Sequence, residues 1–181
     1  MKTFTIAGFI VTLLAATVVI VAQETPGQEK EHAWLKQLIG EWESELEMTM
    51  GPGQPPQKMK GTESVRAIGG LWIVADVRGN SPMGPMTALL TLGYDPQKKK
   101  YVGTWIDSMV NHLWLYEGTL DPAGKILTLD TEGPSMMDPE KRAKYRDAWE
   151  IKSKDHKVLT SSVLGEDGKW STMLTVNYRR K

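Results

Sequence analysis

Polar and apolar residues alternate along most of the chain after residue 40, and this pattern predicts β-strands. In the clearest case, four glutamates at 41, 43, 45 and 47 alternate with Trp42, Ser44, Leu46 and Met48. A period of two places the two sets on opposite faces of a strand. The same pattern predicts ten strands, near residues 41–50, 58–67, 71–78, 87–94, 101–108, 112–120, 126–132, 145–152, 157–164 and 170–179.

One segment before the first strand has helical spacing. Over residues 29–39 the apolar residues Trp34, Leu35, Leu38 and Ile39 recur at intervals of three and four, and Gly40 provides a stop. We therefore expect one short helix ahead of the strands.

The connections between the predicted strands alternate in kind. Those at 67–70, 95–100, 121–125 and 153–157 are tight, whereas those at 51–57, 79–86, 108–111 and 133–144 are mostly long, and 165–168 is short again. In an up-and-down meander, alternate connections lie at the same end, and a meander this long usually closes because free edges invite aggregation. The sequence thus predicts an all-β fold, a closed antiparallel barrel of about ten strands with one end closed and one end open.

The first 22 residues differ in composition from the rest. Lys2 precedes an uncharged run over residues 4–22, which is followed by the polar residues 23–29. This pattern is typical of a cleaved secretory signal, although the run is also long enough for a retained anchor in the inner membrane. Both interpretations place the domain at 30–181 outside the cytoplasm, in the periplasm or secreted, and only an uncleaved segment would bring it to a membrane.

Composition excludes several functions. The formal net charge is zero and no basic field is present, so we expect no nucleic acid partner. The chain has no Cys, which excludes disulfides, thiolate metal sites and a Cys nucleophile. It also has no serine nucleophile elbow, no HExxH and no phosphate-binding glycine loop. We predict no cofactor and a binding protein rather than an enzyme, and the sequence does not indicate an oligomeric state.

The start of the first predicted strand and the end of the last one resemble a known pattern. Gly40-Glu41-Trp42 is a GxW after a short helix, and Arg179 and Arg180 end the last strand. This resembles lipocalins and calycins, and the resemblance implies that Trp42 lies at the closed end with one of these arginines packed on it. More closely, the chain resembles a bacterial family known as domain of unknown function 1579. That resemblance implies a lipocalin-like barrel and no established activity. The matching stretches are His32, Leu35, Leu38 and 40–42, then Gly69-Gly70 with Trp72, then 92–95, 101–109 and Tyr178-Arg179.

Sorting the strands by face gives a candidate site inside the barrel. If Ser108 pairs with Asn111, Asp107 lies opposite His112 and Trp105 lies opposite Trp114. Apolar walls with a few convergent polar groups are typical of small-ligand sites. We therefore predict a pocket for a small, largely apolar molecule, lined by Glu63, Trp105, Asp107, His112, Trp114, Tyr116, Asp147 and Trp149. On the last strand, the residues expected to point inward are Trp170, Thr172, Leu174, Val176 and Tyr178.

Other interpretations of these residues stay open. The tryptophans can simply fill the barrel, as in a structural protein of the cell envelope, and the buried acids can pair with an Arg or a Tyr. Asp107 and His112 can order their hairpin by a hydrogen bond, or serve with Glu63 or Asp147 as acid and base in an isomerase or hydrolase. A metal site needs more ligands than this pair. The methionines of the long connections form either an adaptable rim or a sealing cap; they are Met83, Met86, Met109, Met136 and Met137.

Overall fold

The structure is a computed structural model, and it describes residues 29–48, 55–81, 84–136, 138 and 140–181. The proposed signal or anchor at 1–22, nearly all of the linker at 23–29, and Met83 and Met137 lie outside the described residues.

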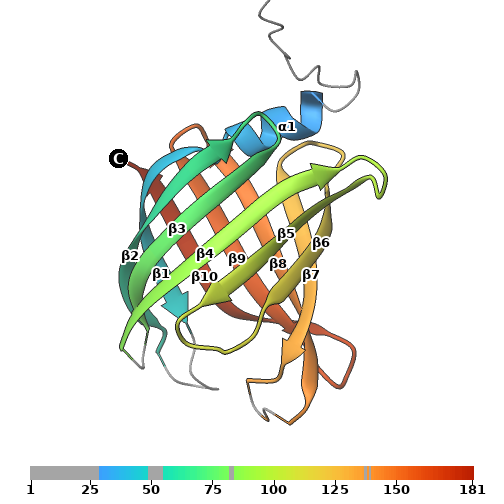
Figure 1. Cartoon of the computed structure of the whole chain (residues 1–181). Coiled ribbons are helices and arrows are strands. Elements are labelled where there is room, and N and C mark those ends of the chain that lie inside the picture. The colour runs from blue at the N-terminus through green and yellow to red at the C-terminus, as the bar shows by residue number, and fades with distance from the viewer. Residues whose placement is uncertain (1–28, 49–54, 82–83, 137, 139) are drawn as a thin grey trace, which may run out of the picture.

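The chain forms a closed antiparallel barrel in which each strand pairs with the next and the first pairs with the last (Figure 1). This confirms the predicted up-and-down, lipocalin-like topology. One helix, α1 (Glu29–Lys36), precedes ten strands. The strands are β1 (Gly40–Met48), β2 (Gln57–Ile68), β3 (Trp72–Ser81), β4 (Gly84–Asp95), β5 (Lys100–Asp107), β6 (Trp114–Leu120), β7 (Ile126–Pro134), β8 (Arg142–Ser153), β9 (His156–Leu164) and β10 (Trp170–Arg180).

Helix α1 lies over one end of the barrel, which we call the closed end; the opposite end is the mouth (Figure 1). The tight connections lie at the closed end and the other connections at the mouth, as the alternation predicted. The helix ends three residues earlier than the periodicity suggested, and its apolar face remains buried through Trp34, Leu35 and Leu38, each 2% exposed. The helix therefore covers the closed end with apolar side chains.

Trp42 and the terminal arginine meet as the lipocalin resemblance implied. Arg180 lies opposite Trp42 in the pairing of β1 with β10, and its guanidinium lies 4.1 Å from the centroid of the Trp42 ring. The same guanidinium donates hydrogen bonds to the carbonyls of Ile39 and Gln37, at 2.7 and 3.1 Å. Trp42 Nε1 donates to the carbonyl of Leu38 at 2.9 Å. These bonds hold the carbonyls of the segment between α1 and β1 and so fix the helix to the strands.

Two β-bulges change which side chains face the interior. In β10 the register with β9 shifts between Thr172 and Leu174, so the prediction that Trp170 and Thr172 point inward is wrong. Trp170 is 37% exposed and stacks under the guanidinium of Arg146, 4.3 Å from the ring centroid. In β8 the register with β9 shifts between Ile151 and Ser153, which places Lys157 opposite the inward-facing Ile151. A bulge adds one unpaired residue and so reverses the alternation beyond it.

Candidate functional site

A buried ion pair lies near the closed end of the interior. Lys157 on β9 donates a hydrogen bond through Nζ to the Glu63 carboxylate on β2, and both side chains are 1% exposed. The ammonium also lies 4.6 Å from the ring centroids of Trp42 and Tyr178 and 4.9 Å from that of Trp149. Aromatic ring faces attract a cation, so this cage compensates part of the hydration that Lys157 loses.

Burial and charge act on this pair in opposite directions. Burial raises the pKa of Glu63 and lowers the pKa of Lys157, because each charged form loses its hydration. The charge of each partner opposes the shift of the other, and Arg180 also disfavours the charged form of Lys157. The arrangement leaves no room for a guest molecule at this level and serves the packing of the closed end.

A second polar group lies in the middle of the barrel. Tyr116 on β6 donates a hydrogen bond to Asp147 Oδ2 on β8 at 2.7 Å, and Ser161, directly opposite Asp147 on β9, donates to the same carboxyl. Burial raises the pKa of Asp147, while both hydrogen bonds favour its ionised form. Burial also raises the pKa of Tyr116, so its hydroxyl remains a donor. Asp147 is only partly buried, and it points into the barrel.

Asp107 shapes the connection between β5 and β6. Its carboxylate accepts hydrogen bonds from the backbone N–H groups of Met109 and Val110, at 2.7 and 2.8 Å, and from Trp105 Nε1 at 2.8 Å. Trp105 lies opposite Trp114 in the predicted register, but β6 begins at Trp114, so the strand pairing stops there and does not extend to Asp107 and His112. The turn that Asp107 ties together ends the strand pairing before it reaches His112.

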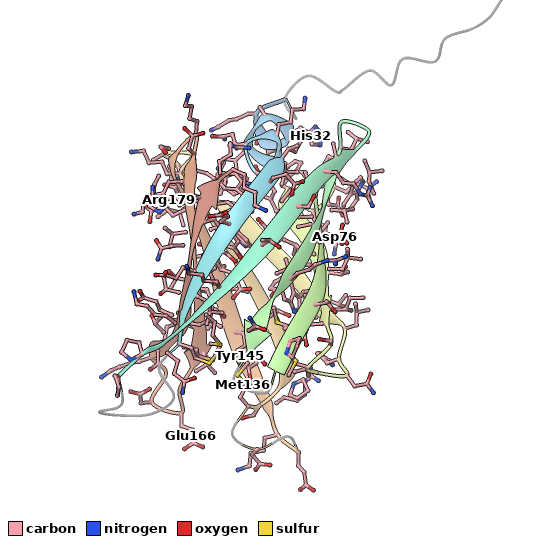
Figure 2. All side chains as sticks on the ribbon, turned by 90° about the vertical axis from the view of Figure 1, so that its left-hand side faces the viewer. His32, Asp76, Met136, Tyr145, Glu166 and Arg179 are labelled. Carbon is pink, nitrogen blue, oxygen red and sulfur yellow. The ribbon has the colours of Figure 1, made fainter. Side chains whose placement is uncertain are left out.

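His112 belongs to an aromatic cluster at the mouth with Trp114 and Tyr145. The His112 and Trp114 rings meet edge to face at 4.9 Å, and those of Trp114 and Tyr145 at 5.2 Å. Gly133 makes room for Trp114, because a Cβ there would lie 2.3 Å from the indole. Tyr145 donates to the carbonyl of Pro134 at 2.8 Å and accepts from the N–H of Met136. Figure 2 shows Tyr145 and Met136 at the mouth, opposite the end that carries His32. This cluster fills the β6–β8 side of the mouth.

Another side of the interior, from its middle to the mouth, is apolar, and most of its side chains contact the core but are only partly buried. Its inward-pointing side chains come from β1, β2, β9 and β10, and each keeps part of its surface accessible. We call this set the open wall: Leu46, Met48, Met59, Leu159, Val163 and Leu174. Toward the closed end the inward Leu92, Leu127 and Leu129 are 0% exposed. Because strand pairing closes the barrel on all sides, the exposed surface of the open wall faces the interior or its opening at the mouth.

A separate hollow of 580 Å³ lies at the connection between β5 and β6, lined by residues 106–113. It contains Asp107 and His112 from the predicted site. However, it is open to solvent and lined only by the end of β5 and the connection that follows it, including Ile106 and Leu113, which are 46% and 53% exposed. Ligand sites usually enclose most of the ligand, so we place the candidate site against the open wall rather than here.

The structure divides the predicted site residues into three groups. Glu63 and Trp149 belong to the closed end, Tyr116 and Asp147 to the middle, and Asp107, His112, Trp105 and Trp114 to the region around the β5–β6 connection. Asp107 and His112 line one hollow, but the predicted acid–base group is not completed, because Glu63 pairs with Lys157 at the closed end and Asp147 bonds to Tyr116 in the middle. Among the described residues, no group of three or more His, Asp or Glu side chains is arranged to hold a metal ion.

The sequence interpretation missed Lys157 and included no residue of the open wall in the predicted site. Lys157 follows a lysine-rich turn, where a basic side chain normally faces water, and only the bulge beside Lys152 turns it inward. The sequence contains one signal for this cation: Glu63 is predicted to point inward, and a buried carboxylate is costly unless it is paired. Of the predicted methionine rim, Met86 lies in β4, Met109 is partly buried and Met136 is 63% exposed.

Comparisons with known proteins agree with the fold and name no activity. A family model described as "Protein of unknown function (DUF1579)" matches residues 27–180. The crystal structure of Rv2717c from M. tuberculosis is 11% identical, with a TM-score of 0.60, over 88% of this chain and 99% of that one. A redesigned β-barrel, mFAP1, bound to DFHBI is 14% identical, with a TM-score of 0.42, over 80% and 96%. No curated protein matches the chain. In the part of the chain that is described, no helix is long and apolar enough to span a bilayer.

Proposed function

The chain belongs to the DUF1579 family, whose function is unknown, and we propose that it binds a small, largely apolar molecule against the open wall. The proposal rests on the geometry of the barrel itself. The observation that supports this most is the accessible surface of inward-pointing Leu46, Leu159 and Leu174 in a barrel whose other end is packed. Apolar surface facing interior space gains free energy when a ligand displaces water from it.

The shape of the interior supports the same proposal. Helix α1 and the Lys157 cage block the closed end, so a guest enters from the mouth. The aromatic cluster of His112, Trp114 and Tyr145 occupies one side of that mouth, which leaves the side next to β1, β2, β9 and β10. Trp105 is the predicted site tryptophan that keeps accessible surface in the mouth half.

A neutral fluorescent probe tests the proposal directly. N-phenyl-1-naphthylamine should gain emission on mixing with the protein, because it leaves water for an apolar site. Replacing Leu159 with Trp fills the open wall and should weaken probe binding about tenfold or more, equivalent to about 1.4 kcal/mol. Thr160→Trp adds the same indole one residue along β9, on the outer face of the barrel, and serves as the matched control.

The control should bind the probe as the unmodified protein does, and both variants should show the urea midpoint of a folded barrel. No gain in emission with the unmodified protein, or equal binding by Leu159→Trp, would refute the proposal. Native mass spectrometry of freshly purified protein adds a second test, since a bound natural ligand appears as a defined added mass.

Export is part of the proposed role, and it rests on the sequence of residues 1–22 alone. We propose that the barrel acts in the periplasm or after secretion, either free or held by an uncleaved residue 4–22 segment at the inner membrane. Fractionation of cells followed by intact-mass measurement tests this. A protein found in the cytoplasm with its first 22 residues retained would contradict it.

A further inference from the structure

The charges that point into the barrel are unevenly placed along its axis. Among the described residues, the inward-pointing charged side chains are Glu63, Asp107, Asp147, Lys157 and Arg180. Both cations belong to the closed end. The two carboxyl groups of Asp107 and Asp147 therefore face the rest of the interior without a basic partner.

Neither cation is available to a guest. Lys157 is 1% exposed and bonded to Glu63 inside three aromatic rings. Arg180 covers Trp42 and donates to backbone carbonyls at the end of α1. In the described part of the barrel, a ligand carboxylate inside the interior thus meets no inward-pointing Lys or Arg that is free to pair with it.

The neutral donors beside the two carboxyl groups are already used. The Tyr116 hydroxyl and Ser161 donate to Asp147, and Trp105 Nε1 donates to Asp107. Ser44 and Thr131 add neutral hydroxyls to the interior, and these accept as readily as they donate. Thr131 Oγ1 has no hydrogen-bond partner but is fully buried, so the polar groups that a ligand can reach include the spare lone pairs of the two carboxyl groups, which accept hydrogen bonds.

Asp147 is placed to meet the head of a ligand whose tail lies on the open wall. It lies opposite Ser161, and the next inward residue of β9, Leu159, belongs to the open wall. Its side chain is partly exposed, and because it points inward this exposed surface faces the interior space. An apolar chain packed on Leu159 and Leu174 would therefore bring its polar end to Asp147.

We infer that the ligand is an amphiphile whose head donates hydrogen bonds, an alcohol or an ammonium, and that the barrel discriminates against fatty carboxylates. This inference rests on the proposed function and specifies its ligand class. A buried carboxylate near Asp147 and Asp107 would suffer repulsion without a compensating cation, whereas an ammonium or a hydroxyl would satisfy an acceptor that is already present.

Displacement of N-phenyl-1-naphthylamine by decylamine, decanol and decanoate tests the inference at mildly alkaline pH, where the ligand carboxylate is ionised. The three competitors share a ten-carbon backbone and differ in the polar head group. Decylamine and decanol should displace the dye at concentrations at least about tenfold lower than decanoate. Asp147→Asn keeps the size of the side chain and should remove most of the advantage of decylamine over decanoate. A second measurement needs no variant: lowering the pH should strengthen decanoate binding, because the acid becomes neutral.

The outcomes separate the inference from the proposed function. Binding of all three heads with decanoate the strongest would overturn the inference and leave apolar ligand binding intact. Dye binding that none of the three displaces would likewise exclude this ligand class. An absence of dye binding would refute the proposed function itself. If Asp147→Asn fails to fold, decanoate affinity that does not rise as the pH falls still overturns the inference.

Discussion

The closed end and the open wall use similar residues for different purposes. At the closed end, Leu127 and Leu129 are fully buried, and even the charged pair of Glu63 and Lys157 is bonded and surrounded by rings. On the open wall, Leu159 and Leu174 point inward from the same barrel and remain partly accessible. A protein interior is normally packed as densely as an organic crystal, so the closed end follows the rule and the open wall departs from it. The comparison indicates that stability comes mainly from the closed end and that binding uses the open wall.

The largest expected effect comes from breaking the buried ion pair. Lys157→Met should lower the free energy of unfolding by about 3–5 kcal/mol, because it leaves the Glu63 carboxylate buried without a partner. The double variant Glu63→Leu/Lys157→Met removes both charges and should recover most of that loss. Urea unfolding of the two variants measures the difference. Equal destabilisation by the single and double variants would mean that the loss reflects packing rather than the unpaired charge.

The same substitution at the two ends sharpens the comparison. Leu127→Ala at the closed end should cost about 2–5 kcal/mol of unfolding free energy, since it opens a cavity in a packed region. Leu174→Ala on the open wall should cost only about 1–2 kcal/mol, because that side chain already borders space. Urea unfolding of both variants under one set of conditions provides the measurement. Similar losses at the two positions would show that the open wall is packed like the core.

The smallest effect is a pH dependence that belongs to Asp147. Burial raises its pKa above the ordinary value of 3.8, so the folded protein holds this proton more tightly than the unfolded chain. The stabilisation from this bound proton is complete below the pKa of Asp147 in the unfolded chain. It is lost as the pH rises through the pKa of Asp147 in the folded protein. The unfolding free energy of the unmodified protein minus that of Asp147→Asn should therefore fall as the pH rises from about 4. A difference that stays constant or rises with pH would contradict the raised pKa.

Much of the fold is predictable from the sequence, because the alternation of polar and apolar residues in strands and the residue types in turns are local properties. The glutamates of residues 41–47 define one outer face, and the tight turns identify the closed end, so topology and the meeting of Trp42 with an arginine are predictable. The two bulges are not, because each depends on how one strand fits its neighbour. A simple hairpin places Lys157 opposite Lys152 and outside, whereas the bulge places it opposite Ile151 and inside.

The candidate site is less predictable than the fold for a related reason. Facing follows from alternation, and Glu63, Trp105, Tyr116, Asp147 and Trp149 all point inward as predicted. Which inward side chains fill the barrel and which border space depends on the volumes of distant partners. Lys157 of β9 bonds to Glu63 and contacts the Trp149 ring, so neither residue is left for a ligand. The accessible leucines come from strands at both ends of the chain.

A crystal structure of the protein soaked with N-phenyl-1-naphthylamine tests most directly whether the mouth half of the barrel holds a guest. We predict density for the probe between β1, β2, β9 and β10, in contact with Leu159 and Leu174 and close to Asp147. Side chains of the open wall that meet one another across the barrel, with no space and no density between them, would contradict the proposed binding role.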